Sequence, residues 1–410
     1  MLRVNDPYSS PSSFLRLCAT ALFLLCIYTG FSQKKDSTFY DPGKKIVKEL
    51  YETTTKGGKT VKHGSYRIFY ENGKLWQEGR IENDKLTGEW KTFHANGKLK
   101  QILTYQNGSR TGTSKIYYDD GSLYQELNYK NDRINGSVNV YRVGFENTLS
   151  ETSLYQNDTL EGVSLSFSEN RKMVCRKNYR KGIVTGRSES FFESGKRSEI
   201  ANYKNGLLEG EFTSYYKDSI NNIQKRCNYV RGKLNGNFTG YYPKGGIMMR
   251  GNYVNDSLQG EYLHFFPPKD KTIEEGALVE KGNYKDNERT GLWTSYYPDG
   301  GTYTTGNFSK GKFEGEWKVY FPNGKPKQTG NYVQGVEHGE WKFYHDNGNP
   351  YMETKFNMGK RDGLVKEFHA NGVIKGEYNL KNGVLDGRQT SYDETGKILE
   401  VQFYENGIKK

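Results

Sequence analysis

Hydrophobic positions in this chain recur at a fixed spacing, and a glycine marks each recurrence. The marking glycines are Gly64, Gly88, Gly112, Gly136, Gly162, Gly186, Gly210, Gly236, Gly260, Gly291, Gly315, Gly339, Gly363 and Gly387. They are 24 residues apart, except for steps of 26 after Gly136 and Gly210 and of 31 after Gly260. A fixed period of this length indicates a repeat architecture, in which each unit contacts only its neighbours. We therefore expect one long repeat domain over residues 64–410.

Aromatic residues occupy two positions after the marking glycines. The fifth position is aromatic in every unit: Phe69, Phe93, Tyr117, Tyr141, Phe167, Phe191, Tyr215, Tyr241, Phe265, Tyr296, Tyr320, Tyr344, Phe368 and Tyr392. The second position is aromatic in eight units: Tyr66, Trp90, Phe212, Phe238, Tyr262, Trp293, Trp317 and Trp341. Offsets of two and five point to opposite faces of an unbroken strand. Either a bulge brings both sets to one face or both faces carry aromatic side chains.

Each unit also holds two turn signals. Examples of the first are Asn96-Gly97 and Asn323-Gly324, and examples of the second are Asn205-Gly206 and Asn83-Asp84. Asn-Gly and Asp-Gly pairs between short aromatic or β-branched runs are strong hairpin signals, because these residues tolerate positive φ. The array has no glycine-free segment of ten residues with the helical period of 3.6. Each unit is therefore predicted to be a β-hairpin.

The consensus can now be compared with known repeats. The units that start at Gly88, Gly315 and Gly339 read Gly-Glu-Trp-Lys-x-(Tyr/Phe)-x-x-x-Gly and close on x-Gly-x-x-x-Gly. This pattern resembles the MORN repeat, specifically its longer bacterial variant, over residues 64–410. The resemblance implies an all-β fold: an elongated single-layer antiparallel β-meander of about 14 hairpin repeats. Six units lack the second-position aromatic, which leaves their local packing open.

The first 32 residues differ from the rest of the chain. Arg16 precedes the apolar run Leu17–Tyr28, and the small residues Gly30 and Ser32 follow it. A basic start, a short apolar run and small residues predict a secretory signal peptide over residues 1–32. Residues 33–63 then form a lead-in segment with a degenerate repeat. This predicts an exported protein, periplasmic or associated with the outer envelope.

The two cysteines beyond residue 32, Cys175 and Cys227, lie two repeats apart. Four strand spacings would separate them by roughly 19 Å. The Cα atoms of a disulfide are only about 4.4 to 6.8 Å apart. We therefore expect two unpaired thiols.

Composition and charge change this picture only in part. The 33 Tyr, 21 Phe and 48 Gly residues fit a thin aromatic layer better than a thick aliphatic core. The net charge of +12 favours acidic partners, but the basic residues are interleaved with 48 acids along every repeat. A solvated mixed-charge surface is the simpler interpretation, and binding of anionic lipid or glycan is the alternative. We expect no nucleic-acid partner.

Catalytic and metal-binding patterns are missing from the sequence. His94, His345 and His369 share one offset, but residues at equal offsets in adjacent units lie roughly 10 Å apart, too far to share a zinc ion. We expect these rings to replace Tyr and Phe near a turn. The phosphate-binding, nucleophile-elbow and zinc-protease motifs do not occur. We therefore expect no enzyme activity, no metal and no cofactor.

The longer units suggest where a partner binds. Their extra residues, near Phe145, near residues 218–222 and in residues 267–281, all fall between the two strands of their unit and should project from one edge. Insertions on one edge often mark a binding side, although neutral loop growth explains them equally well. The candidate contacts are Phe145, Pro267, Pro268, Lys269, Lys271, Trp293, Trp317 and Trp341.

The leading hypothesis is an exported, non-enzymatic scaffold that mediates protein–protein interaction in the bacterial cell envelope. One alternative is the peripheral binding of anionic lipid or glycan by exposed Tyr, Trp and Lys side chains. A second comes from the resemblance, because bacterial proteins with these repeats are often described as antitoxins. It implies neutralisation of a toxin partner.

Overall fold

The computed structural model describes residues 33–145, 147–217, 220–270 and 272–410, so the predicted signal peptide lies outside the described residues. The described chain forms a single sheet of 35 strands. The strands are β1 (Lys34–Phe39), β2 (Val47–Lys56), β3 (Lys59–Phe69), β4 (Leu75–Glu82), β5 (Lys85–Phe93), β6 (Leu99–Gln106), β7 (Ser109–Arg110), β8 (Gly112–Tyr117), β9 (Leu123–Lys130), β10 (Arg133–Tyr141), β11 (Leu149–Gln156), β12 (Thr159–Phe167), β13 (Met173–Arg180), β14 (Ile183–Val184), β15 (Gly186–Phe191), β16 (Arg197–Lys204), β17 (Leu207–Leu208), β18 (Gly210–Tyr215), β19 (Ile223–Val230), β20 (Lys233–Tyr241), β21 (Ile247–Val254), β22 (Ser257–Phe265), β23 (Leu278–Lys285), β24 (Glu288–Tyr296), β25 (Thr302–Ser309), β26 (Lys312–Tyr320), β27 (Pro326–Val333), β28 (Val336–Tyr344), β29 (Pro350–Asn357), β30 (Lys360–Arg361), β31 (Gly363–Phe368), β32 (Ile374–Lys381), β33 (Val384–Tyr392), β34 (Ile398–Glu405) and β35 (Ile408–Lys409).

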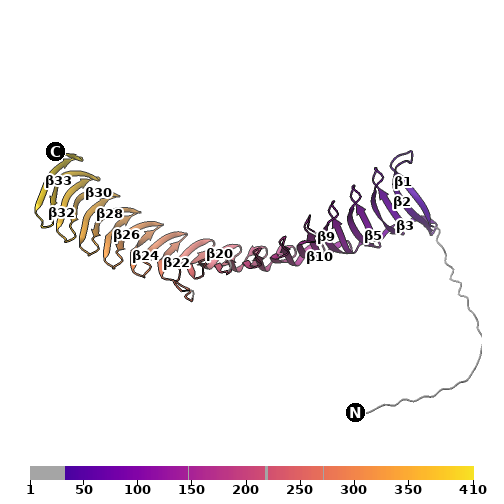
Figure 1. Ribbon diagram of the computed structural model, residues 1–410, viewed down its shortest axis with the longest axis horizontal. Coiled ribbons are helices and arrows are strands. Elements are labelled where there is room, and N and C mark those ends of the chain that lie inside the picture. The colour runs from indigo at the N-terminus through magenta and orange to yellow at the C-terminus, as the bar shows by residue number, and fades with distance from the viewer. Residues whose placement is uncertain (1–32, 146, 218–219, 271) are drawn as a thin grey trace, which may run out of the picture.

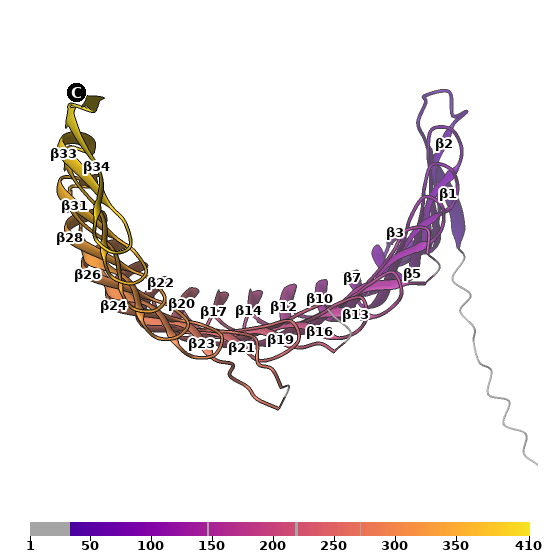
Figure 2. The ribbon, with the colours of Figure 1, turned by 60° about the vertical axis from the view of Figure 1, so that its left-hand side comes forward.

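Successive strands pair antiparallel, as β25 does with β24 and β26. Where a strand is split in two, both parts pair with the same preceding strand, as β7 and β8 do with β6. The sheet is therefore a meander, long and twisted in Figure 1 and bent into a broad arc in Figure 2. The predicted elongated single-layer β-meander is confirmed. No helix long and apolar enough to cross a membrane was found in the described part of the chain.

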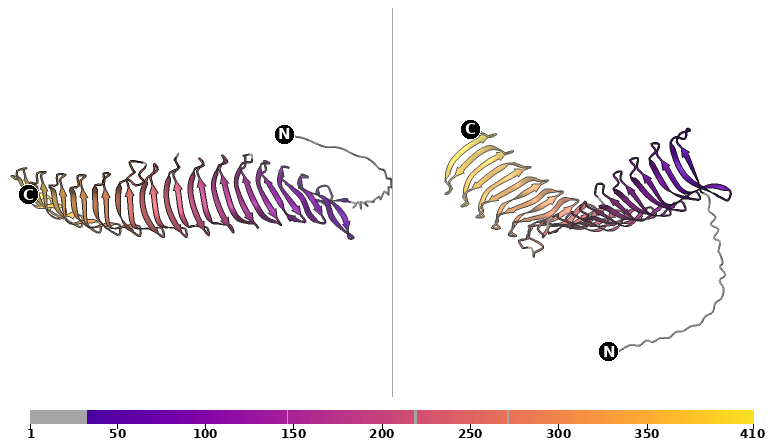
Figure 3. Two further views of the ribbon diagram at one scale, coloured as in Figure 1. Left: turned by 90° about the horizontal axis from the view of Figure 1, so that it is seen from below. Right: turned by 45° about the vertical axis from the view of Figure 1, so that its right-hand side comes forward.

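Two rows of turns follow the two long edges of the sheet, as the left view of Figure 3 shows. In the first turn of a unit, His94 N donates to Lys98 O and Gly97 N donates to His94 O, both at 2.8 Å. The second turn has two residues in the left-handed region, such as Asn205 (φ 52°) and Gly206 (φ 83°). Asn and Gly adopt this conformation at low cost, which is why the sequence signals were strong. We call the two rows the first-turn edge and the second-turn edge.

The marking glycine of each unit forms a bulge. Gly306 pairs with Trp317 while its neighbour Asn307 pairs with Glu314, so Gly315 and Glu316 are extra residues in β26. Gly315 has φ 74°, and all the other marking glycines also have positive φ. A residue with a Cβ atom would be strained there, which explains the invariance within the array. In four units the bulge splits the strand, as between β7 and β8.

Both faces of the sheet carry aromatic side chains, which answers the question that the offsets left open. On one face Trp317 packs edge-on against Tyr332, with ring centroids 6.3 Å apart. On the other face Tyr141 donates to Glu126 Oε2 at 2.7 Å, and burial together with this contact raises the pKa of Tyr141 to about 12. We call the face that carries the second-position residues the tryptophan face.

Glycines beneath the rings make the tryptophan face possible in a single layer. A Cβ added to Gly306 would lie 1.9 Å from the Trp317 ring, and one added to Gly330 would lie 2.1 Å from the Trp341 ring. In one unit without a second-position aromatic, Val138 pairs with Leu127, which occupies the place that Gly306 has opposite Trp317, and both side chains are buried. Side-chain volume is thus exchanged between the two strands of this pair, and this unit packs without a second-position aromatic.

In nine of the fourteen units the residue six positions after the marking glycine ties one repeat to the next. His94 Nε2 lies 3.2 Å from the carbonyl oxygen of Tyr117 in the following unit. The equivalent carbonyl is contacted in the same way by Tyr40, Tyr70, Tyr118, Arg142, Tyr216, Tyr242, Tyr297, His345 and His369. The three histidines therefore replace tyrosine in a structural contact, as the sequence suggested.

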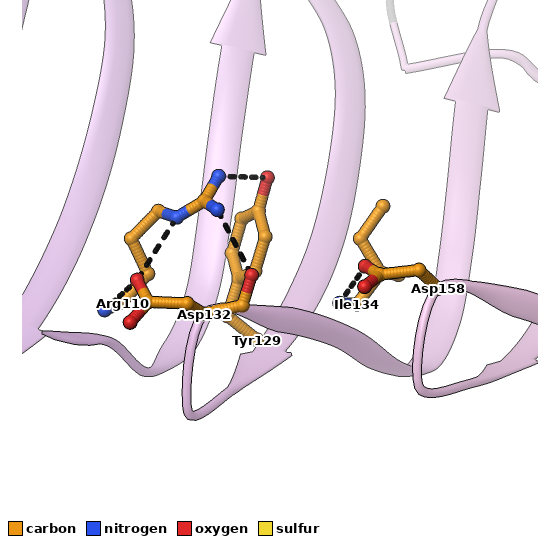
Figure 4. A network of polar contacts seen from close by, with 5 residues as sticks. All are labelled: Arg110, Tyr129, Asp132, Ile134 and Asp158. Atoms are coloured by element: carbon orange, nitrogen blue, oxygen red, sulfur yellow. Dashed lines mark hydrogen bonds and ion pairs between the residues drawn. The ribbon is translucent and has the colours of Figure 1, made fainter.

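Carboxylates tie the repeats together at the second-turn edge. Asp132 Oδ1 accepts from the Arg110 amide at 2.8 Å, and Asp158 Oδ1 accepts from the Ile134 amide at 2.7 Å in the next unit (Figure 4). The Arg110 side chain adds contacts to the Asp132 carbonyl at 2.9 Å and to the Tyr129 hydroxyl at 3.1 Å.

Units whose second turn ends in glycine, such as Gln334-Gly335, use an acid at another position to join neighbouring second turns. In these units the residue before the marking glycine is the acceptor, as when Glu314 Oε2 accepts from the Gln334 amide at 2.9 Å. Glu161, Glu209 and Asp362 make the equivalent contact. An acid in one of two sequence positions therefore joins neighbouring second turns.

Removing the charge of Asp132 is expected to make thermal stability less dependent on pH. Hydrogen bonds from the Arg110 amide, together with the Ser109 hydroxyl and the Arg110 guanidinium, hold the pKa of Asp132 below its usual value. Its contribution is therefore complete above the unfolded-state pKa of about 3.9 and is lost as the pH falls through the lower folded-state pKa. Asn keeps the positive φ and an acceptor oxygen, so Asp132→Asn removes only the charge.

The measurement is the melting temperature of the wild type and of Asp132→Asn between pH 7 and pH 2. The wild type should be the more stable protein at pH 7, and the difference should vanish in acid. The control is Asp119→Asn, because Asp119 is exposed and its carboxylate forms no hydrogen bond with another described residue. A difference that stays constant across this range would contradict the assigned role.

Candidate functional site

All three insertions lie on the first-turn edge, as predicted. They are closed by the hydrogen bond that closes the ordinary first turns. Arg142 N donates to Thr148 O at 2.9 Å, Tyr216 N donates to Asn222 O at 2.8 Å, and Phe266 N donates to Ala277 O at 2.7 Å. The loop between β22 and β23 projects furthest from the arc in Figure 2. The repeat is therefore unchanged, and the extra residues extend its turn.

The third insertion, residues 266–277, folds back onto the first turn of the preceding unit. Ile247 N donates to Glu274 O at 2.7 Å, and Arg250 Nη2 lies 2.5 Å from Glu275 Oε1. Pro268 packs on Gly246, where an added Cβ would lie only 2.4 Å from its ring. Ile247 beneath the loop is 1% exposed. The insertion thus covers part of the sheet with a short second layer.

The second insertion, residues 216–222, reaches the same first turn from the other side. Asn222 Nδ2 donates to the carbonyl of Pro243 at 2.9 Å. Residues 242–246 are therefore contacted by an insertion on each side. We call the described residues 216–217, 220–222, 242–246, 266–270 and 272–277 the triple-loop site.

A cavity of about 430 Å³ lies between the first turn at residues 242–246 and the third insertion. It is lined by Tyr242, Pro243, Lys244, Gly245, Pro267, Pro268 and Lys269. Its walls are fixed, because the Tyr242 hydroxyl donates to Phe265 O at 2.6 Å and Phe265 is 4% exposed. Its chemistry is an apolar wall of proline and tyrosine with two lysines, and these lining residues include no acid.

The predicted contacts fall into two groups. Pro267, Pro268 and Lys269 lie in the triple-loop site, while Lys271 is outside the described residues. Phe145, which is 46% exposed, lies in the first insertion on the same edge.

The three tryptophans among the predicted contacts belong to the packing of the sheet. Trp293 and Trp341 are only 3% and 2% exposed, and Trp317 is half-buried over Gly306. The indole Nε1 atoms of Trp293 and Trp341 donate to the carbonyls of Asn283 and Asn331, both at 3.2 Å. The structure does not bring these rings to the insertions.

Sequence reasoning missed Tyr242, Pro243 and Lys244, because their unit carries no insertion of its own. Their loop becomes a wall of the cavity only because the following unit folds back over it. The one available signal was the pair Gly245-Gly246, since the second glycine is where Pro268 approaches.

Reactive groups in the described residues are dispersed. No group of three or more His, Cys, Asp or Glu side chains that could hold a metal occurs there. Cys175 and Cys227 are both free, which confirms the predicted unpaired thiols. Cys227 is buried, and burial raises the pKa of its thiol.

Comparison with known proteins supports the repeat assignment. The model of the MORN repeat variant matches residues 62–83, 86–107, 110–131, 184–205, 313–334, 337–358, 361–382 and 385–407. These eight segments are MORN-variant repeats, and the protein is thereby placed among the MORN-repeat proteins. No curated protein matches the chain.

Among solved structures, a crystal structure of TcdB2-TccC3-Cdc42 is 11% identical, over 91% of this chain and 23% of that chain, with a TM-score of 0.17. The Photorhabdus luminescens Tc holotoxin pore is 12% identical, over 91% of this chain and 22% of that chain, with a TM-score of 0.16. This chain spans less than a quarter of the length of either.

Proposed function

We propose that this protein is an exported, non-enzymatic repeat scaffold that binds a partner protein in the bacterial cell envelope through its first-turn edge. The observation that carries the proposal is the alignment of three separate insertions on that one edge. Each presents an apolar side chain to solvent: Phe145 is 46% exposed, Ile220 is 65% exposed and Ile273 is 50% exposed. A repeat array holds such loops at set distances along one line, which suits an extended contact.

Apolar residues are also exposed on the second-turn edge, where they repeat one local contact. Ile183 and Leu207 are also about half exposed. They stack on the turn of the next unit, however, since a Cβ added to Gly206 would lie 3.4 Å from Ile183 and one added to Gly232 would lie 3.6 Å from Leu207. The second-turn edge therefore repeats one local contact, whereas the first-turn edge varies its loops.

The test is site-specific photo-cross-linking in cells. A photoreactive amino acid replaces Phe145, Ile220 or Ile273, and in matched controls it replaces Ile183 or Leu207. The proposal expects one envelope protein to be captured from all three insertions and from neither control. Equal capture from both edges, or different proteins at each insertion, would contradict it. A small cytosolic toxin-like partner would instead support the antitoxin alternative.

The exported address is part of the same proposal and has its own test. It rests on the apolar run Leu17–Tyr28 and the small residues after it. Fractionation of cells that express the full chain, followed by N-terminal sequencing, should find a mature form that begins near Gln33. An uncleaved chain in the cytosol would overturn this part.

Binding to an anionic lipid or glycan remains a second candidate because the first-turn edge carries exposed basic side chains in its central repeats. They are Arg171, Lys172, Lys217, Lys244 and Lys269, and they are interleaved with the exposed acids Glu169, Glu193, Asp270 and Glu274. Attraction of this kind falls steeply with ionic strength. Sedimentation with phosphatidylglycerol vesicles at low and at high salt distinguishes it, since a specific protein contact through apolar tips should survive the added salt.

A further inference from the structure

Three features of the triple-loop site together indicate the chemical class of ligand that it binds. It has a concave apolar wall, a ring of contacts that fixes this wall before any partner arrives, and cations at the cavity. Resting on the proposed function, we propose that this site binds an acidic peptide segment of the partner protein. An apolar side chain of that segment enters the cavity, and carboxylates beside it contact Lys244 and Lys269.

The apolar component comes from the shape of the loops. Pro243, Pro267 and Pro268 surround the cavity with rigid rings, and Tyr242 adds an aromatic surface. Grooves lined by aromatic and other rigid apolar side chains are a recurring way to hold an extended peptide, because such walls lose little entropy on binding. A volume of about 430 Å³ is within the range of sites that enclose a small group, and here it suits one or two side chains.

The charge component comes from lysines without counter-ions. Lys244 and Lys269 line the cavity, and neither forms an ion pair with a described residue. Two acids of this loop are engaged elsewhere: Asp270 Oδ1 accepts from the Thr272 amide at 2.9 Å, and Glu275 pairs with Arg250. Because no acid lines the cavity, an anionic ligand is not opposed there. Complementary charge favours an acidic segment and disfavours a basic one.

A peptide fits these observations better than a lipid surface does. The apolar part of the site is a bounded concavity between two loops, not a row of long aliphatic side chains able to enter a bilayer. Pro268 is held against Gly246, and Asn222 holds Pro243 from the other side. A flat anionic membrane would engage the lysines but would leave the cavity unfilled.

The experiment measures fluorescence anisotropy of labelled synthetic decapeptides with the purified full chain. Each peptide has one Phe or Leu flanked by Asp and Glu. Its two controls carry Asn and Gln in place of the acids, or Ala in place of the apolar residue. The proposal expects saturable binding of the acidic apolar peptides and at least a tenfold loss of affinity with either control peptide.

Three variants separate the parts of the site. The double change Lys244→Glu and Lys269→Glu should weaken binding at least tenfold, whereas Lys172→Glu, another exposed first-turn lysine, should change it less than twofold. Gly246→Ala keeps every charge but places a Cβ against Pro268, so the wall must move and affinity should also fall tenfold. Thermal melts of each variant show whether the array remains folded.

Several results would overturn the proposal. The proposal fails if no acidic peptide binds saturably, or if the double change Lys244→Glu and Lys269→Glu leaves the affinity unchanged. It also fails if replacing the apolar residue of the peptide with Ala leaves the affinity unchanged. Binding of vesicles of phosphatidylcholine and phosphatidylglycerol that needs both lysines, without peptide binding, would favour a lipid instead. If cross-links from the three insertions persist in the double variant while peptides fail to bind, only this inference falls. If the cross-links fail while peptides bind, only the proposed function falls.

Discussion

Trp341→Ala is expected to lower the free energy of unfolding of its part of the array by about 3 to 5 kcal/mol. The Trp341 side chain is 2% exposed, and it packs on Tyr332, Phe343 and Phe356 with ring centroids 5.1 to 6.1 Å apart. Removal of the indole ring leaves a cavity, and a single-layer sheet has no second layer of side chains that could move in to fill it. The removal also leaves the Asn331 carbonyl without its indole donor.

Because each unit of an array contacts only its neighbours, this loss should be confined to the repeats around Trp341. Urea denaturation gives the size of the effect, and amide hydrogen exchange by mass spectrometry gives its position. The matched control is Trp76→Ala, since Trp76 is 38% exposed and should cost about 1 kcal/mol or less. Equal losses at the two positions would show that the tryptophan face contributes no more than the surface.

Gly306→Ala is expected to destabilise the array by about 3 kcal/mol, although it adds only one methyl group. That methyl group would lie 1.9 Å from Trp317 Cε3, so the ring must leave its place. Gly376→Ala is the matched control. Gly376 also lies in a second strand, but its Cβ would meet only Thr390 O, at 3.7 Å. We expect this control to be neutral or slightly stabilising, because Ala reduces the freedom of the unfolded chain.

The exchange of volume between strands can be tested in the same background. Gly306→Leu combined with Trp317→Val recreates the pair Leu127 and Val138, which the chain already uses. The double variant should be more stable than Gly306→Leu alone, and the coupling should be about 1 to 3 kcal/mol in a double-mutant cycle measured by urea denaturation. Additive losses would mean that the two positions do not share one space.

The fold was predictable because its determinants are local. The turn pairs, the marking glycines and the fifth-position aromatics each act within one hairpin, so a single unit such as Gly315–Gly339 reveals them. The shared edge of the insertions followed from the same logic. The offset of an insertion within its unit decides which row of turns it extends, whatever its sequence.

What the sequence did not reveal depends on contacts between neighbouring units. Gly306 is unremarkable in its own hairpin, and its purpose appears only when Trp317 of the next unit lies on it. For the same reason Trp293 and Trp341 looked like exposed contacts, because the rings that bury them belong to neighbouring strands of the same layer. The wall formed by Tyr242 and Pro243 was hidden in the same way, since the loop that completes it belongs to the following unit.

The contacts that most first turns make with the carbonyl of the next unit run along the length of the sheet, across the strands. A force that pulls the two ends of the chain apart would therefore break these contacts and the strand pairings one after another. Each hairpin of 24 residues would release roughly 70 to 80 Å of chain, its extended length less the two strand spacings it occupied. A protein built in this way yields in small steps under tension, and it keeps every remaining hairpin folded while it does so.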